Sequence, residues 1–438
     1  MTGIRSGRHS TDGELFEPPA RRDHVWLANI YATPWHLPEG VPSEPPGTYL
    51  RLGRLERHLA GAAAQMPRVV HLIDLDHDRV AVRRWNHPRL LTAARLWLLA
   101  VPSGQIVAVL GLDVRCGPGR TVDLLEDCYH LDVRADGRAV EALAAEALGV
   151  EGDFLPERHQ IVFAPAISAA RCDEIVRRVV HRGDLPRRGE FDTITYPAEL
   201  NRRTETVAAV GPYVSILGGQ REHVENLVFL SAVQGVAGAA RLREIRSAAY
   251  SAVGTFRGRD REGQGTHARR ETLERLSDRL GDMELDLSYS VEATADLGML
   301  VPSLPVAGYH DALYSVMGLV DKAETVARML RRLERAIAAE LTAIESRERR
   351  ADEDRRLRWT AAIGAVSTLA VPVGLILAFL GVNASEVDVT RSMFDGRYLP
   401  VYGLAVVLLL VGALVSAGLY VQQRRAVHRD GRDAGRGG

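Results

Sequence analysis

Residues 359–383 read WTAAIGAVSTLAVPVGLILAFLGVN, and this stretch decides how the rest of the chain is interpreted. The part from Trp359 to Leu380 contains no charged side chain. Because a helix rises 1.5 Å per residue, such a segment spans roughly 33 Å, enough for a bilayer core of about 30 Å. A buried helix of a soluble protein rarely stays uncharged over this length. We therefore predict a first transmembrane helix at residues 359–380.

A second apolar segment follows at residues 399–421, which read LPVYGLAVVLLLVGALVSAGLYV and also lack a charge. Arginines cluster before the first segment and in the tail after the second, residues 422–438, whereas the loop at residues 381–398 holds three acids and two arginines. Basic residues favour the cytoplasmic side of a membrane. We therefore predict a two-span protein of the cell membrane, with both termini in the cytoplasm and the loop outside.

The segment before the first span has the apolar period of a long helix. Residues 309–358 contain no proline and one glycine, Gly318, and their apolar residues recur at steps of three or four. The pattern runs into the first span, so we predict one continuous helix that begins near residue 309 and enters the membrane. A lone helix of that length is unstable in water and must pack on helices of its own chain or of other copies.

Two more helical segments are predicted upstream, at residues 222–253 and 266–295. The second is acidic and the long helix is rich in arginine. Charge-complementary packing between them is one interpretation, and a solvated acidic face is the other. Pro302 and Pro305 separate these segments from the long helix. Residues 201–358 are thus predicted to form a helical cytoplasmic stalk.

Residues 1–200 are predicted to form a mixed α/β cytoplasmic domain. Residues 33–47 are rich in proline and are predicted to be a loop, and the start of the chain, Met1 to Asp23, lacks the apolar core of a signal peptide. Short apolar runs bounded by turn residues predict strands at 69–74, 80–85, 96–101, 106–112 and 161–164. Helices are predicted at 50–66, 139–148 and 169–182.

Composition argues against several classes of function. The formal net charge is −1, so no overall bias indicates nucleic-acid binding. Lys322 is the only lysine and no P-loop sequence occurs, which argues against ATP use by that motif. The three cysteines have no metal-ligand spacing, and no nucleophile–base pair is evident. We do not expect an enzyme or a covalent cofactor.

The end of the first predicted span resembles a known family. Ser367 and Thr368 precede Pro372, and Gly381-Val382-Asn383 follows it. Together with the long preceding helix and the second span followed by basic residues, this run is similar to the CorA superfamily of magnesium and divalent-cation channels, which includes the ZntB zinc transporters. The family signature is Gly-Met-Asn, so Val382 departs from it, and the longer outer loop lacks the usual Met-Pro-Glu-Leu segment. The resemblance covers the chain well from position 200 to position 425, and the part before it only by general class.

The resemblance implies a homo-oligomer, expected to be a pentamer, with an α/β cytoplasmic domain, a long-helix stalk and two C-terminal transmembrane helices per subunit. It implies a channel or transporter for divalent cations, gated by the cytoplasmic domain, with Mg²⁺ expected first and Co²⁺, Ni²⁺ or Zn²⁺ as alternatives. Gly381, Val382 and Asn383 would form the pore mouth, where amide oxygens bind the hydrated ion. The membrane potential would drive uptake, since 100 mV supplies about 4.6 kcal/mol for a divalent cation.

Three further groups of residues are predicted to act on the ion. Carboxylates of the outer loop would raise the local cation concentration; they are Glu386, Asp388 and Asp395. A small, weakly polar helix face is predicted to line the pore or, alternatively, to mediate helix packing; it comprises Thr360, Ile363, Ser367, Val371, Gly374 and Ala378. In the family, intracellular divalent ions bridge acids of neighbouring subunits and hold the pore closed; the region predicted here contains Asp278, Asp282, Glu284 and Asp286.

A second class of function stays open at this point. The altered signature, the longer outer loop and the unassigned N-terminal domain also fit a membrane-embedded signalling or effector protein. Such a protein would use a CorA-like scaffold without housekeeping metal transport. An enzyme tethered to the membrane is a third hypothesis. Uptake of divalent cations into vesicles separates the channel from the other two.

Overall fold

The computed structural model describes residues 24–38, 40–52, 66–183, 194–258, 266–288 and 306–382, and isolated positions between 396 and 418. The chain divides into two compact units, Met1–Ile337 and Ala338–Gly438. Most of the helix predicted at residues 50–66 lies outside the described residues. Almost all of the outer loop and more than half of the second predicted span also lie outside the described residues.

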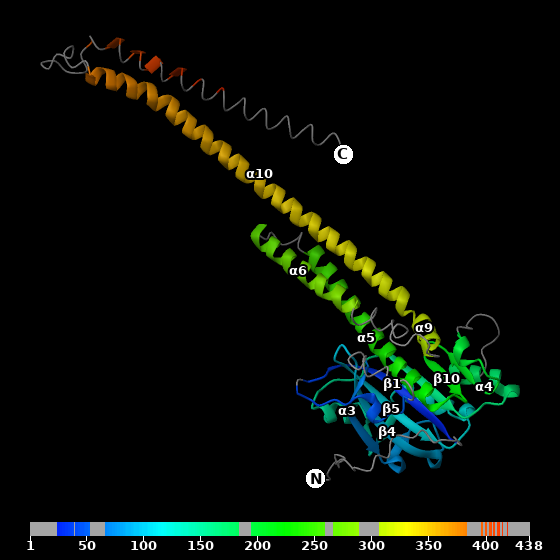
Figure 1. Ribbon diagram of the computed structural model, residues 1–438. Coiled ribbons are helices and arrows are strands. Elements are labelled where there is room, and N and C mark those ends of the chain that lie inside the picture. The colour runs from blue at the N-terminus through cyan, green and yellow to red at the C-terminus, as the bar shows by residue number, and fades with distance from the viewer. Residues whose placement is uncertain are drawn as a thin grey trace. The chain divides into compact units, whose positions relative to one another are not determined.

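The first unit is built on a seven-stranded sheet, whose central strands are drawn in blue and cyan in Figure 1. Neighbouring strands pair antiparallel, except for the parallel pair β8–β10. Parallel pairing requires a crossover connection, and the chain between these two strands contains α4 (Cys172–Val180). In spatial order the strands are β2 (Arg68–Leu75), β4 (Leu91–Ala100), β5 (Gln105–Val114), β1 (Val25–His36), β8 (Arg158–Ala164), β10 (Val214–Gly218) and β9 (Val207–Val210).

The N-terminal region is therefore α/β, and its five predicted strands are confirmed with shifted boundaries. β4 begins at Leu91 rather than at residue 96, whereas β3 (Val80–Val82) ends earlier than predicted. β3 belongs to a small second sheet with β6 (Val133–Ala135) and β7 (Arg138–Ala139). The hairpin between β4 and β5 closes through a hydrogen bond of 2.9 Å from Val101 N to Gln105 O.

The central strand, β1, was not predicted from the sequence. Its first nine residues are all buried because both faces of the sheet are covered. The strand therefore lacks the alternation of apolar and polar residues that marks a half-exposed strand. The predicted loop at residues 33–47 is wrong at its start, since β1 extends to His36. Pro34 lies where the pairing with β5 is irregular, and a missing N–H is tolerated at such a place.

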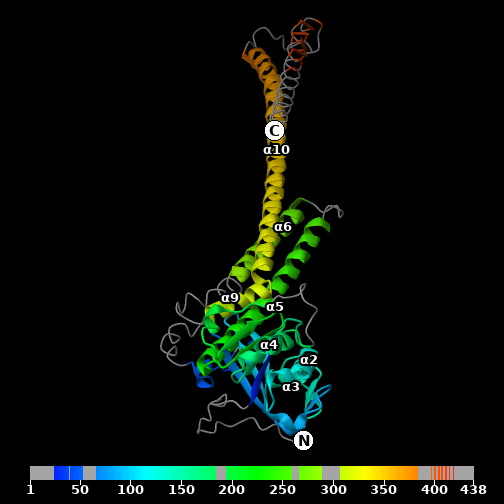
Figure 2. The same cartoon turned by 90° about the vertical axis from the view of Figure 1, so that its right-hand side faces the viewer.

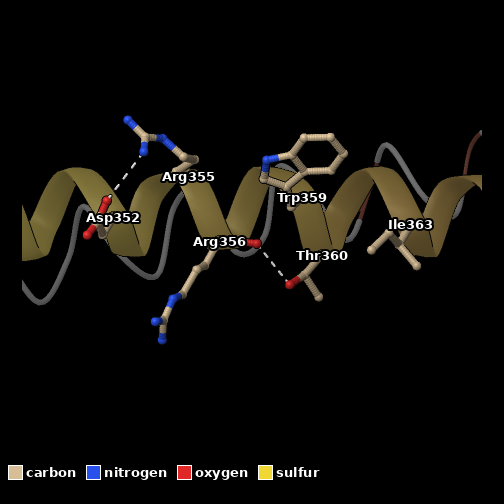
Figure 3. A pocket seen from close by; sticks show the side chains of 6 residues that line it. All are labelled: Asp352, Arg355, Arg356, Trp359, Thr360 and Ile363. Atoms are coloured by element: carbon tan, nitrogen blue, oxygen red, sulfur yellow. Dashed lines mark hydrogen bonds and ion pairs between the residues drawn. The ribbon is translucent and has the colours of Figure 1, made fainter.

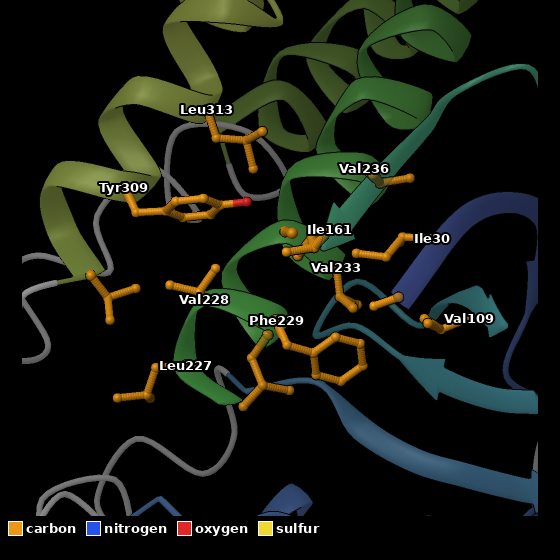
Figure 4. Packing of buried hydrophobic residues seen from close by; sticks show 14 of the residues in the cluster. Ile30, Val109, Ile161, Leu227, Val228, Phe229, Val233, Val236, Tyr309 and Leu313 are labelled. Carbon is orange, nitrogen blue, oxygen red and sulfur yellow. The ribbon is translucent and has the colours of Figure 1, made fainter. Parts of the chain in front are cut away.

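One face of the sheet packs against α5 (Glu222–Gly258) and α9 (Val306–Val316), as Figure 4 shows. Phe229 of α5 points at the strands, and its ring centroid lies 5.6 Å from that of Trp26. Trp26 in turn stacks on Phe163 with centroids 4.7 Å apart. Tyr309 and Leu313 bring α9 into the same apolar cluster. This core joins the sheet to the helices that precede the long helix.

The opposite face packs against three short helices, α2 (Val122–Tyr129), α3 (Val140–Leu148) and α4 (Figure 2). α3 matches its prediction, α4 covers most of the segment predicted at 169–182, and α2 was not predicted. Buried leucines and valines of these helices contact the strand side chains that point to this face of the sheet. The region is thus a three-layer α/β/α arrangement.

α6 (Thr266–Leu287) packs on α5 within the first unit. The guanidinium of Arg241 on α5 pairs with the carboxylate of Asp286 on α6. Burial opposes the charge of Arg241, but Glu244 and Asp286 outweigh it and raise its pKa. The apolar residues of α6 that recur at helical spacing are all buried, namely Leu273, Leu276, Leu280, Met283 and Leu287.

The long helix does not run unbroken from residue 309, and that prediction is wrong. α9 ends at Val316, and α10 (Leu319–Val382) begins three residues later. Gly318 adopts a positive φ of 63°, which glycine tolerates best, and its N–H donates to Ser315 O at 2.9 Å. The one glycine of the segment thus ends α9. α10 then continues for 64 residues, about 96 Å at 1.5 Å per residue.

Candidate functional site

The predicted pore mouth lies at the C-terminal end of α10. Gly381 and Val382 are the last two residues of that helix. Asn383 and the three outer-loop acids, Glu386, Asp388 and Asp395, lie outside the described residues. Their roles in binding or attracting a cation stay predictions.

The two predicted spans are described only in part. Residues 359–380 belong to α10, and Pro372 does not end the helix. Of residues 399–421, the structure describes separate positions. Within the described parts of the chain, no helix combines the length and the apolarity that crossing a bilayer requires. Both spans stay predictions.

All six predicted pore-lining residues, Thr360, Ile363, Ser367, Val371, Gly374 and Ala378, lie on α10 and are exposed. Ile363 and Val371 are 62% and 59% exposed, and a Cβ placed on Gly374 would meet no atom within 4 Å. Helical geometry of 3.6 residues per turn puts the six on one face. An uncharged face that the described part of the chain does not cover is available to lipid or to other subunits.

A groove runs along α10 where the first predicted span begins (Figure 3). It has a volume of about 470 Å³ and is lined by Asp352, Arg355, Arg356, Trp359, Thr360 and Ile363. Arg355 Nη1 lies 3.6 Å from Asp352 Oδ1, and Thr360 Oγ1 donates to Arg356 O at 2.9 Å. The lining changes from charged to apolar within three helical turns. This groove was not predicted as a site.

The four predicted regulatory acids divide between two sides of α6. Asp286 turns toward α5, where it pairs with Arg241. Asp278, Asp282 and Glu284 instead line a groove of about 390 Å³ together with Glu334 of α10. Sequence reasoning missed Glu334 because periodicity along one helix does not reveal what a second helix places opposite. Glu334, the charged residue that α10 places in this groove, is acidic. Among the described residues, the groove therefore contains no pairing between the acids of α6 and the arginines of the long helix.

The described residues of this acidic groove do not form a metal centre. Among the residues that the structure describes, no group of three or more His, Cys, Asp or Glu side chains is arranged to hold a metal ion. Divalent cations such as Mg²⁺ and Ca²⁺ need several oxygen ligands at about 2.0–2.6 Å. The regulatory metal site at these acids stays a prediction.

A buried chain of hydrogen bonds joins the sheet to α9. The Tyr309 hydroxyl donates to Ser215 Oγ at 3.2 Å, and Ser215 Oγ lies 2.8 Å from His159 Nε2. All three side chains are buried. Burial lowers the pKa of His159 to about 3, so the ring is neutral at physiological pH. A serine next to a histidine can be a catalytic pair, but this one lies inside the core, where we assign it to holding α9 on the sheet.

His159 is expected to make stability depend on pH. Its pKa of about 3 in the folded protein lies below the ordinary 6.5, so the unfolded chain binds a proton that the folded protein excludes. The stabilisation is complete above pH 6.5 and is lost as the pH falls toward 3. Between pH 7 and pH 5 this residue should lower the free energy of unfolding by about 2 kcal/mol.

Urea unfolding followed by tryptophan fluorescence at both pH values measures this effect. The variant His159→Gln should lose that part of the pH dependence, whereas His71→Gln, at an exposed position of β2, should keep it. An identical pH slope in His159→Gln and the wild type would contradict the assignment.

The chain matches no protein-family model, no curated protein and no solved structure. The resemblance to the CorA superfamily therefore rests on the residues of the first predicted span and on their place in the chain.

Proposed function

We propose that this chain is one subunit of an oligomeric membrane channel or transporter for divalent metal cations, with Mg²⁺ the first expected ion. The observation that carries the proposal is α10, which includes residues 359–380 and keeps the six predicted pore residues exposed on one face. In a symmetric assembly every copy contributes the same face to a central axis. A ring of such faces would make a narrow, uncharged passage.

Asn383 would form the selective mouth of this passage. Mg²⁺ loses its water reluctantly, so a mouth that selects it should bind the hydrated ion through oxygen acceptors. One amide from each copy would supply such a ring of oxygens. Gly381 has no side chain, which would let the backbone of each copy approach the axis closely. Inward movement down the membrane potential needs no ATP site.

The first unit offers a mechanical connection for gating. Tyr309 of α9 is bonded to Ser215 of the sheet, and the next residue, His310, has its Nδ1 2.8 Å from Ser231 Oγ of α5. α10 begins a few residues later. A rearrangement of the sheet or of α5 would therefore move α9 and reach the start of α10 across Gly318. This connection supports control of the pore by the cytoplasmic region.

Ion uptake into vesicles tests the proposal. Purified protein in proteoliposomes, under an inside-negative potassium-diffusion potential, should take up Mg²⁺, Co²⁺, Ni²⁺ or Zn²⁺ faster than protein-free vesicles. Asn383→Ala and Gly381→Ala should lower uptake at unchanged oligomer size, because they alter the mouth rather than the core. Wild-type protein that moves none of the four ions under any gradient would reject the proposal. The signalling or effector alternative would then be favoured.

A further inference from the structure

We propose that the groove at residues 352–363 of α10 binds the headgroup of an anionic phospholipid. The inference rests on the proposed function, because it takes residues 359–380 as the first transmembrane helix. It assigns a ligand to a surface that pore formation does not require.

The side chains of the groove follow the order of the layers at a membrane surface. Going toward the predicted span, the lining passes from Asp352 through two arginines to Trp359, and ends at Ile363. From Arg356 to Ile363 the helix rises about 10 Å. The interfacial layer on each side of a bilayer is about 5–8 Å thick. With Ile363 in the hydrocarbon, the guanidinium groups therefore reach the level of the lipid phosphates.

The arginines of this segment keep positive charge available for a ligand. Arg355 is paired with Asp352, but both side chains are largely exposed, at 73% and 68%. An exposed ion pair of this kind contributes little stabilisation. A phosphate can therefore replace the carboxylate of Asp352 as the partner of Arg355. Arg356 and Arg358 are exposed and have no ion-pair partner among the residues that the structure describes. A guanidinium can donate two parallel hydrogen bonds to a phosphate, which a lysine ammonium does not do.

Trp359 and Ile363 explain why the ligand is a lipid rather than a free anion. Trp359 is 66% exposed and Ile363 is 62% exposed, directly beside the arginines. A free phosphate would bind the guanidinium groups and leave this apolar surface in water. A phospholipid covers both parts, since its phosphate contacts the arginines and its acyl chains contact the apolar side chains. The groove therefore fits one molecule that is anionic at one end and apolar at the other.

Trp359 also provides a direct measurement. The other four tryptophans, Trp26, Trp35, Trp85 and Trp97, are at most 5% exposed. Brominated acyl chains quench only the tryptophans that they contact, so quenching in proteoliposomes of the full chain reports on Trp359. Trp359→Phe is the control that should abolish the quenched signal. Vesicles would contain equal mole fractions of brominated phosphatidylglycerol or brominated phosphatidylcholine in an unlabelled phosphatidylcholine background.

Brominated phosphatidylglycerol should quench Trp359 at a lower mole fraction than brominated phosphatidylcholine does. An arginine near an anionic surface contributes about a fivefold preference, equivalent to about 1 kcal/mol. The double variant Arg355→Gln/Arg356→Gln should therefore lose about 25-fold of the preference. The matched control Arg347→Gln/Arg350→Gln removes two arginines of the same helix outside the groove and should keep it.

The possible results separate this inference from the proposed function. Equal quenching by both lipids in the wild type would overturn the headgroup site and leave the transmembrane helix standing. An equal loss of preference in both double variants would overturn it too, because general charge would then account for the effect. No quenching by either lipid would show that Trp359 does not reach the membrane, which overturns the site and its premise together. Ion uptake is measured separately and decides the channel by itself.

Discussion

Replacing Gly374 with leucine is expected to reduce divalent-cation uptake to the level of protein-free vesicles. A Cβ at Gly374 meets nothing within 4 Å among the residues that the structure describes, so the new side chain has room at this position. Leucine also favours a helix over glycine by up to about 1 kcal/mol, so α10 should not be weakened. In a symmetric pore, however, every copy would add an isobutyl group to the axis. These groups, one from each copy, would meet at the axis and close the passage.

A matched variant and a size measurement make this prediction specific. Ala362 is also exposed on α10 and lies roughly 120° around the helix from Gly374, so Ala362→Leu should leave uptake nearly unchanged. Light scattering of the purified protein gives the oligomer size of both variants. Normal uptake by Gly374→Leu would contradict a pore-lining role. Dissociation of the oligomer would favour the alternative in which this face mediates helix packing.

Replacing Phe229 with alanine is expected to lower the free energy of unfolding of the α/β region by about 3–5 kcal/mol. Phe229 is fully buried, and its ring centroid lies 5.6 Å from that of Trp26 and 6.4 Å from that of Trp97. Truncation removes apolar contacts and leaves a cavity between α5 and the sheet. The two tryptophan rings cannot collapse far into this space because the strands that carry them are hydrogen bonded on both sides.

Denaturant unfolding of the full chain, followed by tryptophan fluorescence, measures this loss, since four of the five tryptophans lie in the α/β region. Tyr250→Ala is the matched control, because Tyr250 is an aromatic residue of the same helix that is 57% exposed. We expect a change of about 0.5 kcal/mol or less for it. If the two variants had equal stability, the packing of α5 on the sheet described above would be wrong.

The secondary structure was predictable where a local pattern marks it. Strands β2, β4 and β5 alternate or lie between turn residues, and the long apolar period of α10 is evident in the sequence. β1 was missed because burial on both faces removes the alternation. The break at Gly318 was missed because one glycine inside a periodic pattern can either continue a helix or end it. Contacts outside the segment decide which of the two occurs.

The candidate sites were predictable by residue but not by arrangement. The acids of α6 were evident as a cluster, yet the sequence did not show that Asp286 pairs with Arg241 on α5. It also gave no signal that Glu334 faces the other three acids, because Glu334 comes much later in the chain and lies on another helix. The groove at Arg355 and Arg356 was visible only as part of an arginine cluster. The change from charged to apolar side chains along this groove became evident only when the structure showed that these residues share one face of the helix.

The position of β1 has a consequence for synthesis on the ribosome. Asn29 bonds to Leu110, 81 residues further along, and accepts a hydrogen bond from Gln160, 131 residues further along. Translation at about 5–20 residues per second makes this interval roughly 7–26 s for Gln160. Throughout that time a nascent strand that is apolar on both sides has no partners on at least one edge. Chaperone holdases that bind extended apolar segments are suited to shielding that strand during this interval.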